Sequence, residues 1–193
     1  MKNRRTFIQQ SAAAASTLAF PLIGGAQPAA VKIGDAVLGE AQSQPQVGAA
    51  EVEKMNEAGV ASVLGAFASA ICLATTQAAA KYNLPHVVDI GVADQIVQRG
   101  LKNTFRFGPG YGVSAQIAMV NLHVLNSVAG KPAKTVMIIH EESLFGTGTA
   151  NLLSRELPGY GFEVKEVIKH ANPTRDFNNI VLRMKSVNPD IVI

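Results

Sequence analysis

Residues that form disulfides or aromatic cages are scarce: the 193-residue sequence contains one cysteine, three tyrosines and no tryptophan. A single cysteine excludes a disulfide within the chain, and so few tyrosines and tryptophans argue against a wide aromatic cage around a ligand, although not against a small one. Cys72 lies in the apolar segment Ala70–Ala74, so we expect a buried and unreactive thiol.

A long apolar run is also missing, and residues 1–26 indicate a signal peptide instead. Two arginines at 4–5 begin an Arg-Arg-x-Phe-Ile pattern, and a mildly apolar run over 11–23 leads to small residues ending at Ala26. This order predicts export by the twin-arginine route into the periplasm. The apolar run is too short to span a hydrocarbon core, which needs about 20 residues. An ordinary secretory signal and a short membrane anchor are the alternatives.

Basic charge is concentrated in this predicted signal peptide. The chain has 17 Lys and Arg against 14 Asp and Glu, and three of the basic residues are Lys2, Arg4 and Arg5. Their removal would leave equal numbers of basic and acidic residues. The composition therefore gives no reason to expect binding to nucleic acid or to an anionic membrane.

Short β-type runs alternate with helical stretches along the rest of the chain. This alternation predicts an α/β fold with mainly parallel sheets covered by helices on both faces. Ligands bind such sheets at the carboxyl ends of the strands, which selects the loops 66–69, 90–94, 108–112 and 141–146. The predicted strands are 31–34, 60–67, 84–90, 104–107, 134–140, 162–168 and a last strand from 190; the predicted helices are 46–58, 69–82, 94–98, 113–129, 146–157 and 176–186.

No pattern typical of an enzyme or a metal site is visible. The histidines at 86, 123, 140 and 170 lack metal-ligand spacing. Ser143 does not lie in a Gly-x-Ser-x-Gly elbow, and no base is placed beside it. We therefore expect no catalytic residues, no metal and no cofactor.

Two of the selected loops each allow two interpretations. Gly108, Gly110 and Gly112 follow a strand and precede a helix, as in a nucleotide-binding loop, but such a loop needs its third glycine where Val113 stands. Ser69 follows a predicted buried strand and opens a helix. Its hydroxyl and the nearby N–H groups would suit a ligand carboxylate, or Ser69 only caps its own helix.

Taken in series, the loops resemble the Leu/Ile/Val-binding family, the type I periplasmic solute-binding subunits of branched-chain amino acid ABC importers. No single motif is specific, but their order and spacing fit from about Ser43 onward. The matching stretches are Gln42–Gln46, Gly59–Gly65 leading to Ser69, Tyr82–Pro85, Asn103–Phe107, Lys134–Ile139, Phe145–Gly148, Thr174–Phe177 and Asn188–Asp190.

The resemblance implies the type I periplasmic-binding-protein fold, with two Rossmann-like lobes that close on a ligand. Residues 31–111 would form part of lobe one, and residues 112–193 the first half of lobe two. Ser69 would hold the ligand carboxylate, the loop at 90–92 would supply backbone groups, and Phe145 would face the ligand from lobe two. The full set of implied ligand-binding residues is Phe67, Ala68, Ser69, Ile90, Gly91, Val92 and Phe145.

Three departures from the family pattern affect this interpretation. Val92 stands where amino-acid binders usually carry threonine, and Phe145 replaces the commoner tyrosine. Both changes make the predicted pocket less polar, which favours a carboxylate less polar than leucine. A lobe-one helix after the first strand and the second half of lobe two are missing. Because the chain also ends at Ile193 inside a predicted strand, we expect an incomplete fold and a truncated chain.

These observations predict a periplasmic substrate-binding component of an ABC importer. It would capture an amino acid or small organic carboxylate without chemistry, act as a monomer and deliver its ligand to an inner-membrane permease. A ligand-sensing domain of a receptor or regulator is the alternative with the same fold. A nucleotide-dependent enzyme is a further alternative that only the glycine loop supports.

Overall fold

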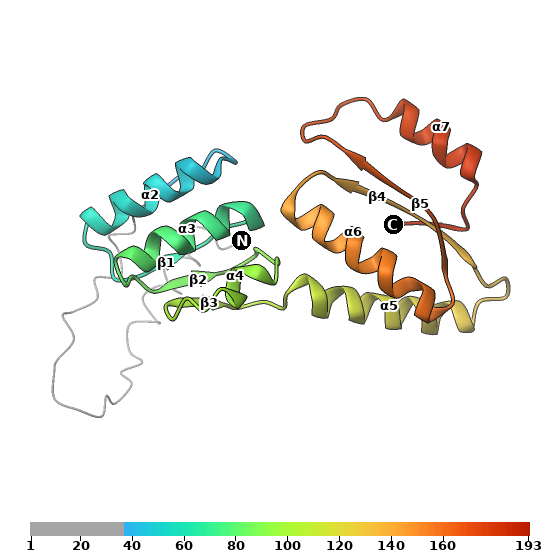
Figure 1. Cartoon of the computed structure of the whole chain (residues 1–193), viewed down its shortest axis with the longest axis horizontal. Coiled ribbons are helices and arrows are strands. Elements are labelled where there is room, and N and C mark those ends of the chain that lie inside the picture. Colours follow the sequence, from blue (N-terminus) through green and yellow to red (C-terminus); the bar gives the residue numbers. More distant parts are fainter. Residues whose placement is uncertain (1–36) are drawn as a thin grey trace, which may run out of the picture. The chain divides into compact units, whose positions relative to one another are not determined.

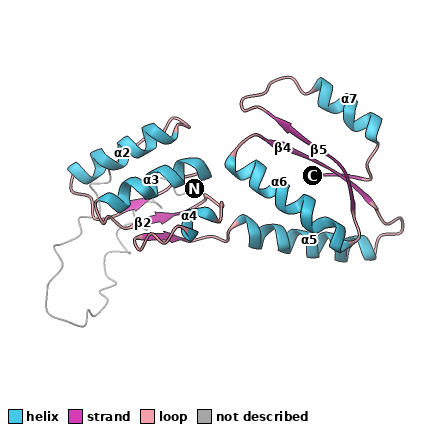
Figure 2. Cartoon of the chain, viewed as in Figure 1, coloured by secondary structure: helices cyan, strands magenta, loops and turns pink. Residues whose placement is uncertain are grey.

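The computed structural model of the protein describes residues 37–193 (Figure 1). The predicted signal peptide and the strand predicted over 31–34 lie outside the described residues. Residues Gly39–Ile193 form one compact unit. Helices and parallel strands alternate along it (Figure 2).

The first part of this unit contains a three-stranded parallel sheet in the order β1-β2-β3. Val52, Val63, Ala79 and Leu84 are buried in the cluster that joins this sheet to its helices. Pro45 occupies the first turn of the first helix, where its fixed φ suits the helix and no backbone bond is lost. The strands are β1 (Val63–Leu64), β2 (His86–Val88) and β3 (Thr104–Arg106), and the helices are α2 (Pro45–Glu57), α3 (Ser69–Lys81) and α4 (Gln95–Gln98).

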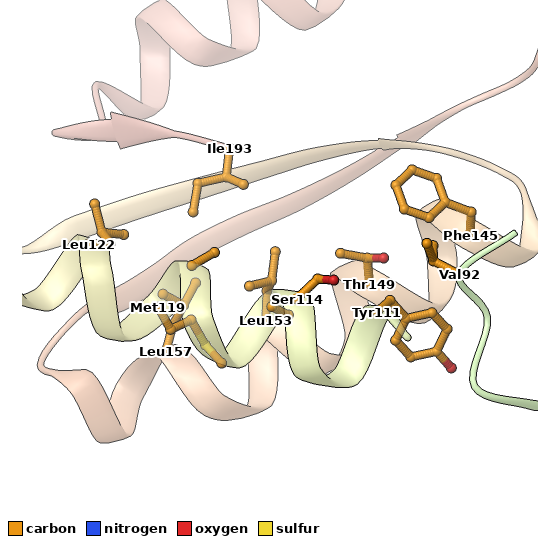
Figure 3. A pocket seen from close by; sticks show the side chains of 12 residues that line it. Val92, Tyr111, Ser114, Met119, Leu122, Phe145, Thr149, Leu153, Leu157 and Ile193 are labelled. Carbon is orange, nitrogen blue, oxygen red and sulfur yellow. The ribbon is translucent and has the colours of Figure 1, made fainter. Parts of the chain in front are cut away.

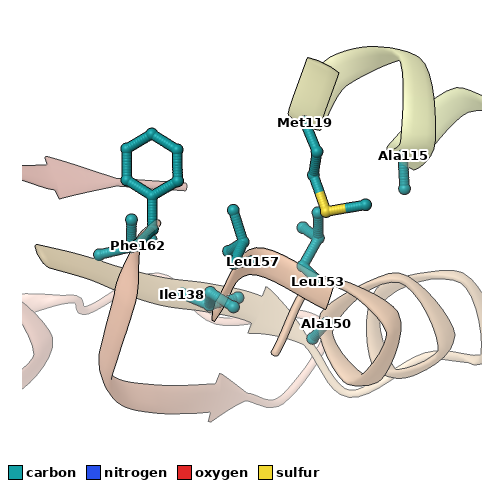
Figure 4. Close-up of a cluster of buried hydrophobic side chains, with 8 residues drawn as sticks. Ala115, Met119, Ile138, Ala150, Leu153, Leu157 and Phe162 are labelled. Carbon is teal, nitrogen blue, oxygen red and sulfur yellow. The ribbon is translucent and has the colours of Figure 1, made fainter. Parts of the chain in front are cut away.

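The second part contains another parallel sheet, in the order β5-β4-β6. Its central strand carries the buried residues Val136, Met137 and Ile138, because a strand covered on both faces is apolar along its length. Met119, Leu153 and Phe162 complete the core (Figure 4). The strands are β4 (Thr135–Glu141), β5 (Glu163–His170) and β6 (Ile191–Val192); the helices are α5 (Tyr111–Ser127), α6 (Leu144–Glu156), the short 3-10 helix η2 (Leu157–Tyr160) and α7 (Asn178–Val187).

The predicted α/β class is confirmed, since every strand pair in both sheets is parallel. The buried strand predicted over 60–67 is wrong in length and burial. Only Val63 and Leu64 are in a strand, and Leu64 and Phe67 are 74% and 78% exposed. Val63 faces the helices, whereas within residues 37–193 no layer buries the opposite face at Leu64.

Three helix starts also differ from the prediction by two residues, and one of them is the helix predicted from 176, which begins at Asn178. The helix predicted from 113 begins at Tyr111. The helix predicted from 146 begins at Leu144, because the Ser143 hydroxyl accepts a hydrogen bond from the backbone N–H of Gly146 and caps it. Among residues 37–193, no helix combines the length and apolar character needed to cross a membrane.

Candidate functional site

A cavity of about 450 Å³ opens at the carboxyl ends of β1, β2 and β4. Its volume lies in the range of small-molecule sites, about 300–1,000 Å³. Six of the seven residues predicted from the sequence line this cavity: Phe67, Ala68, Ser69, Ile90, Val92 and Phe145. Gly91 is buried and is not among the lining residues. The fold thus brings together side chains from three loops; their role in binding stays a prediction.

Ser69 is the most buried polar residue of this cavity, at 4% exposed. Of the two interpretations of Ser69, the one that makes it the N-cap of α3 is wrong. Ala68 is the N-cap, and Ser69 is the first helical residue. Instead, its Oγ accepts a hydrogen bond of 3.1 Å from the backbone N–H of Ala93. The hydroxyl hydrogen therefore remains able to donate to another group.

Gly91 fixes the loop between β2 and α4 by its lack of a side chain. A Cβ at this position would lie 2.3 Å from Sγ of Cys72. The Gly91 N–H and the Cys72 thiol both donate to the carbonyl oxygen of Ala66. Cys72 is fully buried, as predicted, and burial raises the pKa of its thiol. Gly91 is thus a packing position that orients its neighbours Ile90 and Val92.

The glycine loop that suggested a nucleotide site is filled by protein side chains. Asp94 accepts a hydrogen bond of 3.2 Å from the backbone N–H of Gly112. A Cβ at Gly110 would lie 1.7 Å from Oδ1 of Asp94 and 2.5 Å from Nη2 of Arg106. Gly110 and Gly112 therefore make room for this carboxylate and guanidinium. The arrangement gives Gly110 and Gly112 a structural reason that requires no nucleotide.

The loop after β4 supplies residues that the sequence analysis did not assign to the site. Glu141, Ser143 and Leu144 line the cavity beside Phe145. The Ser143 hydroxyl donates to Oε1 of Glu141 at 2.6 Å, so the prediction that no base lies beside Ser143 is wrong. The side-chain amide of Asn172 donates to Oε2 of the same carboxylate at 3.0 Å. Their position at the carboxyl end of a predicted parallel strand was the signal that could have identified them.

A second cavity of about 350 Å³ shares Val92 and Phe145 with the first. Figure 3 shows these two side chains at one end of it and Leu122 at the other. Helices α5 and α6 provide most of its lining, and Met119, Leu153 and Leu157 make it largely apolar. An apolar ligand body could extend past Phe145 into this space.

The residues that line the two cavities offer hydrogen-bonding groups and apolar side chains to a ligand. Neither cavity has a histidine, lysine, arginine or cysteine among its lining residues. Within the described residues, no group of three or more acidic, His or Cys side chains could hold a metal ion. Hydroxyl groups, backbone N–H groups at the start of α3 and apolar side chains are what the site offers.

Comparison with known proteins assigns the chain to a family. Residues 9–193 match the family model described as "Periplasmic binding protein". The Leu/Ile/Val-binding protein homolog 7 of Brucella melitensis is 29% identical over 137 residues, which cover 69% of this chain and 34% of that protein. The chain thus spans about a third of the length of the curated relatives it matches.

Solved structures show the same fold. A solute-binding protein of an ABC transporter from Rhodopseudomonas palustris, in complex with 3,4-dihydroxybenzoic acid, matches with a TM-score of 0.71 at 19% identity over 81% of this chain and 42% of that one. A leucine-binding protein from Thermotoga maritima matches with a TM-score of 0.70 at 21% identity over 79% and 42%. The fold is therefore the type I periplasmic-binding-protein fold.

This family consists of binding proteins, and its name implies a periplasmic location. The match covers all but the first eight residues, and the α/β architecture agrees with it. The chain belongs to the periplasmic binding protein family.

Proposed function

We propose that the chain is the substrate-binding part of an ABC importer, which captures an amino acid or small organic carboxylate without chemistry. The observation that carries this proposal is the cavity at Ser69, where a buried hydroxyl lies at the start of α3. The ligand would be held by Phe67, Ala68, Ser69, Ile90, Gly91, Val92 and Phe145 and delivered to an inner-membrane permease.

The start of α3 has the chemistry that a carboxylate requires. The first intrahelical bond runs from Cys72 N to Ala68 O, so the earlier N–H groups of the helix have no intrahelical acceptor. The helix dipole places partial positive charge at the same end. A hydrogen bond from the Ser69 hydroxyl to a carboxylate would be worth about 1.5–3 kcal/mol.

The remaining walls would enclose the apolar body of the ligand. Phe145 and Leu144 lie after β4, whereas Phe67 and Ile90 lie after β1 and β2. Residues 31–111 and 112–193 would belong to two lobes, so capture would bring these walls together around the ligand. Closure of this kind removes the ligand from water and strengthens its hydrogen bonds.

The ligands of two similar proteins fit this chemistry. The Rhodopseudomonas palustris protein holds 3,4-dihydroxybenzoic acid, and the Thermotoga maritima protein is called a leucine-binding protein. Both compounds carry a carboxylate, on a dihydroxyphenyl ring in the first and beside an α-ammonium group and a branched aliphatic side chain in leucine. Export by the twin-arginine route and a monomeric state complete the proposal.

Isothermal titration of the chain with a panel of amino acids, aliphatic acids and benzoates would test this proposal. We expect saturable binding of at least one carboxylate and no binding of the matching primary amides, which lack the charge. Nucleotides serve as the negative control. If no member of the panel bound, or if amides bound as well as acids, the proposed function would be wrong.

A further inference from the structure

The cavity between α5 and α6 is not used by the proposed function. It is the cavity of about 350 Å³ that shares Val92 and Phe145 with the candidate site. Protein interiors are closely packed and contain few voids larger than a water molecule. An apolar cavity of about 150 Å³ is already large enough to bind benzene. The space between α5 and α6 could therefore hold a large part of a ligand.

The spacing of the lining residues on the two helices accounts for this cavity. Ala115 and Ala118 lie three residues apart on one face of α5, and alanine leaves unfilled the volume that a larger side chain would take. On α6, Phe145, Thr149 and Leu153 follow one another at intervals of four residues and line the same space (Figure 3). The cavity therefore runs along both helices.

The polar side chains of this cavity are Tyr111, Ser114 and Thr149. The Tyr111 hydroxyl donates to Oε1 of Gln95 at 3.2 Å, and Ser114 is exposed to solvent. The Oγ1 of Thr149 is buried and has no hydrogen-bond partner among residues 37–193. Leaving a buried hydroxyl without a partner is costly, so a ligand atom that bonds to it would gain affinity. Thr149 is thus the buried polar group that this cavity offers to a ligand.

The two cavities meet at Val92 and Phe145. Phe145 is 46% exposed, and exposed side chains change rotamer within nanoseconds. Its ring can therefore turn aside for a ligand that extends from one cavity into the other. Ser69 lines only the first cavity, and Thr149 lines only the second. A ligand held by both residues needs a body long enough to pass Phe145.

We propose that the cavity between α5 and α6 is a second compartment of the binding site, and that the ligand is an extended carboxylate with a hydrogen-bonding oxygen along its body. The carboxylate binds at Ser69, the apolar body passes Phe145, and the oxygen accepts from the Thr149 hydroxyl. An acid that ends before Phe145 leaves this compartment empty and buries less apolar surface. The inference rests on the proposed function, because it adds a compartment to the same site.

Straight-chain acids from butanoate to octanoate, measured by isothermal titration of the chain, test the compartment. We expect the affinity to rise about threefold for each added methylene group, since each one buries apolar surface. Ala118→Phe fills the compartment with its ring. It should weaken octanoate binding by about tenfold or more and change butanoate binding by less than about twofold.

Ala50→Phe is the matched control, because Ala50 is exposed on α2 and lines neither cavity. It should leave the affinity for octanoate unchanged. Thermal melts without ligand check that each variant folds. If Ala118→Phe does not fold, Ala118→Leu replaces it and should weaken octanoate binding in the same direction.

Octanoate and its keto derivatives, which place a carbonyl oxygen at successive positions along the same chain, test Thr149. At least one keto acid should bind as tightly as octanoate or more tightly, because the Thr149 hydroxyl donates to its oxygen. Thr149→Val removes the hydroxyl and should reduce the affinity of that keto acid relative to octanoate by about fivefold. Thr149→Ser keeps the hydroxyl and should preserve the ratio.

Four results would overturn the proposal. They are an affinity that does not rise with chain length, octanoate binding that is unchanged in a folded Ala118 variant or equally weakened in Ala50→Phe, a keto-to-octanoate ratio that Thr149→Val leaves unchanged, and 1-hexanol that binds together with octanoate and so reveals a separate apolar site. Each leaves the proposed binding function standing. Failure of every acid to bind the wild-type chain would instead overturn the proposed function, and this inference with it.

Discussion

His86 should make the stability of the fold depend on pH. It is 1% exposed in β2, and its Nε2 lies 3.1 Å from Oγ1 of Thr75. Its Nδ1 is buried and has no hydrogen-bond partner among the described residues. Burial lowers the pKa of His86 from 6.5 to about 4, and the nearby Asp89 offsets this only in part. The folded chain therefore holds His86 neutral at pH values where an unfolded chain would protonate it.

The direction and size of the effect follow from this difference. Between pH 6.5 and about 4 the unfolded state binds a proton that the folded state does not. The stabilisation is thus fully present above pH 6.5 and is lost as the pH falls toward 4. The difference in pKa corresponds to about 3 kcal/mol in the free energy of unfolding.

Urea unfolding followed by circular dichroism, at several pH values from 7.5 down to 4.5, would measure how the free energy of unfolding depends on pH. We expect the wild-type stability to fall across this range and the His86→Gln variant to show a clearly smaller fall. His123→Gln is the matched control, because His123 is exposed and should leave the wild-type slope intact. Parallel pH profiles for the wild-type chain and His86→Gln would refute the reasoning.

Three further predictions concern the loop beside the cavity. Gly91→Ala should lower the free energy of unfolding by about 1–3 kcal/mol, because its Cβ would lie 2.3 Å from Sγ of Cys72; unchanged urea unfolding would contradict this. Val92→Thr should shift preference toward α-amino acids over simple carboxylates by adding a hydroxyl to the cavity wall, and competition titrations should detect the shift unless Val92 lies outside the site. The Cys72 thiol should resist alkylation at pH 8 in the native chain and react rapidly in urea, because burial raises its pKa; fast labelling without urea would show that it is accessible.

Local patterns predicted most of the helices and strands. The apolar residues at 136–139 are consecutive in the sequence, so the strand β4 could be predicted from them alone. The exposed Leu64 and Phe67 were not predictable in the same way. An apolar run predicts a strand that can be buried, but the helices packed on the sheet determine which of the two faces of the strand is covered.

The loops of the candidate site could be predicted from the rule that ligands bind at the carboxyl ends of parallel strands. Contacts between residues far apart in the sequence could not be predicted. Loops at the carboxyl ends of parallel strands converge in any such sheet, and this rule selected the loops that hold Ser69, Ile90 and Phe145. The family resemblance then singled out these residues within the loops. The bond from Ala93 N to Ser69 Oγ spans 24 residues, so the local sequence suggested an N-cap instead. The contact between the Asp94 carboxylate and Gly110 could not be predicted either, because a sequence motif records only the spacing of the glycines.

The most direct test of the account is to titrate the wild-type chain and Ser69→Ala with the acid that binds best in the panel. Ser127→Ala, on α5 away from both cavities, serves as the matched control, and thermal melts without ligand check that each variant folds. The account predicts that Ser69→Ala weakens binding by about tenfold or more while Ser127→Ala binds as the wild type does. Equal affinity in a folded Ser69→Ala variant would contradict it, because the cavity at Ser69 would then not hold the carboxylate.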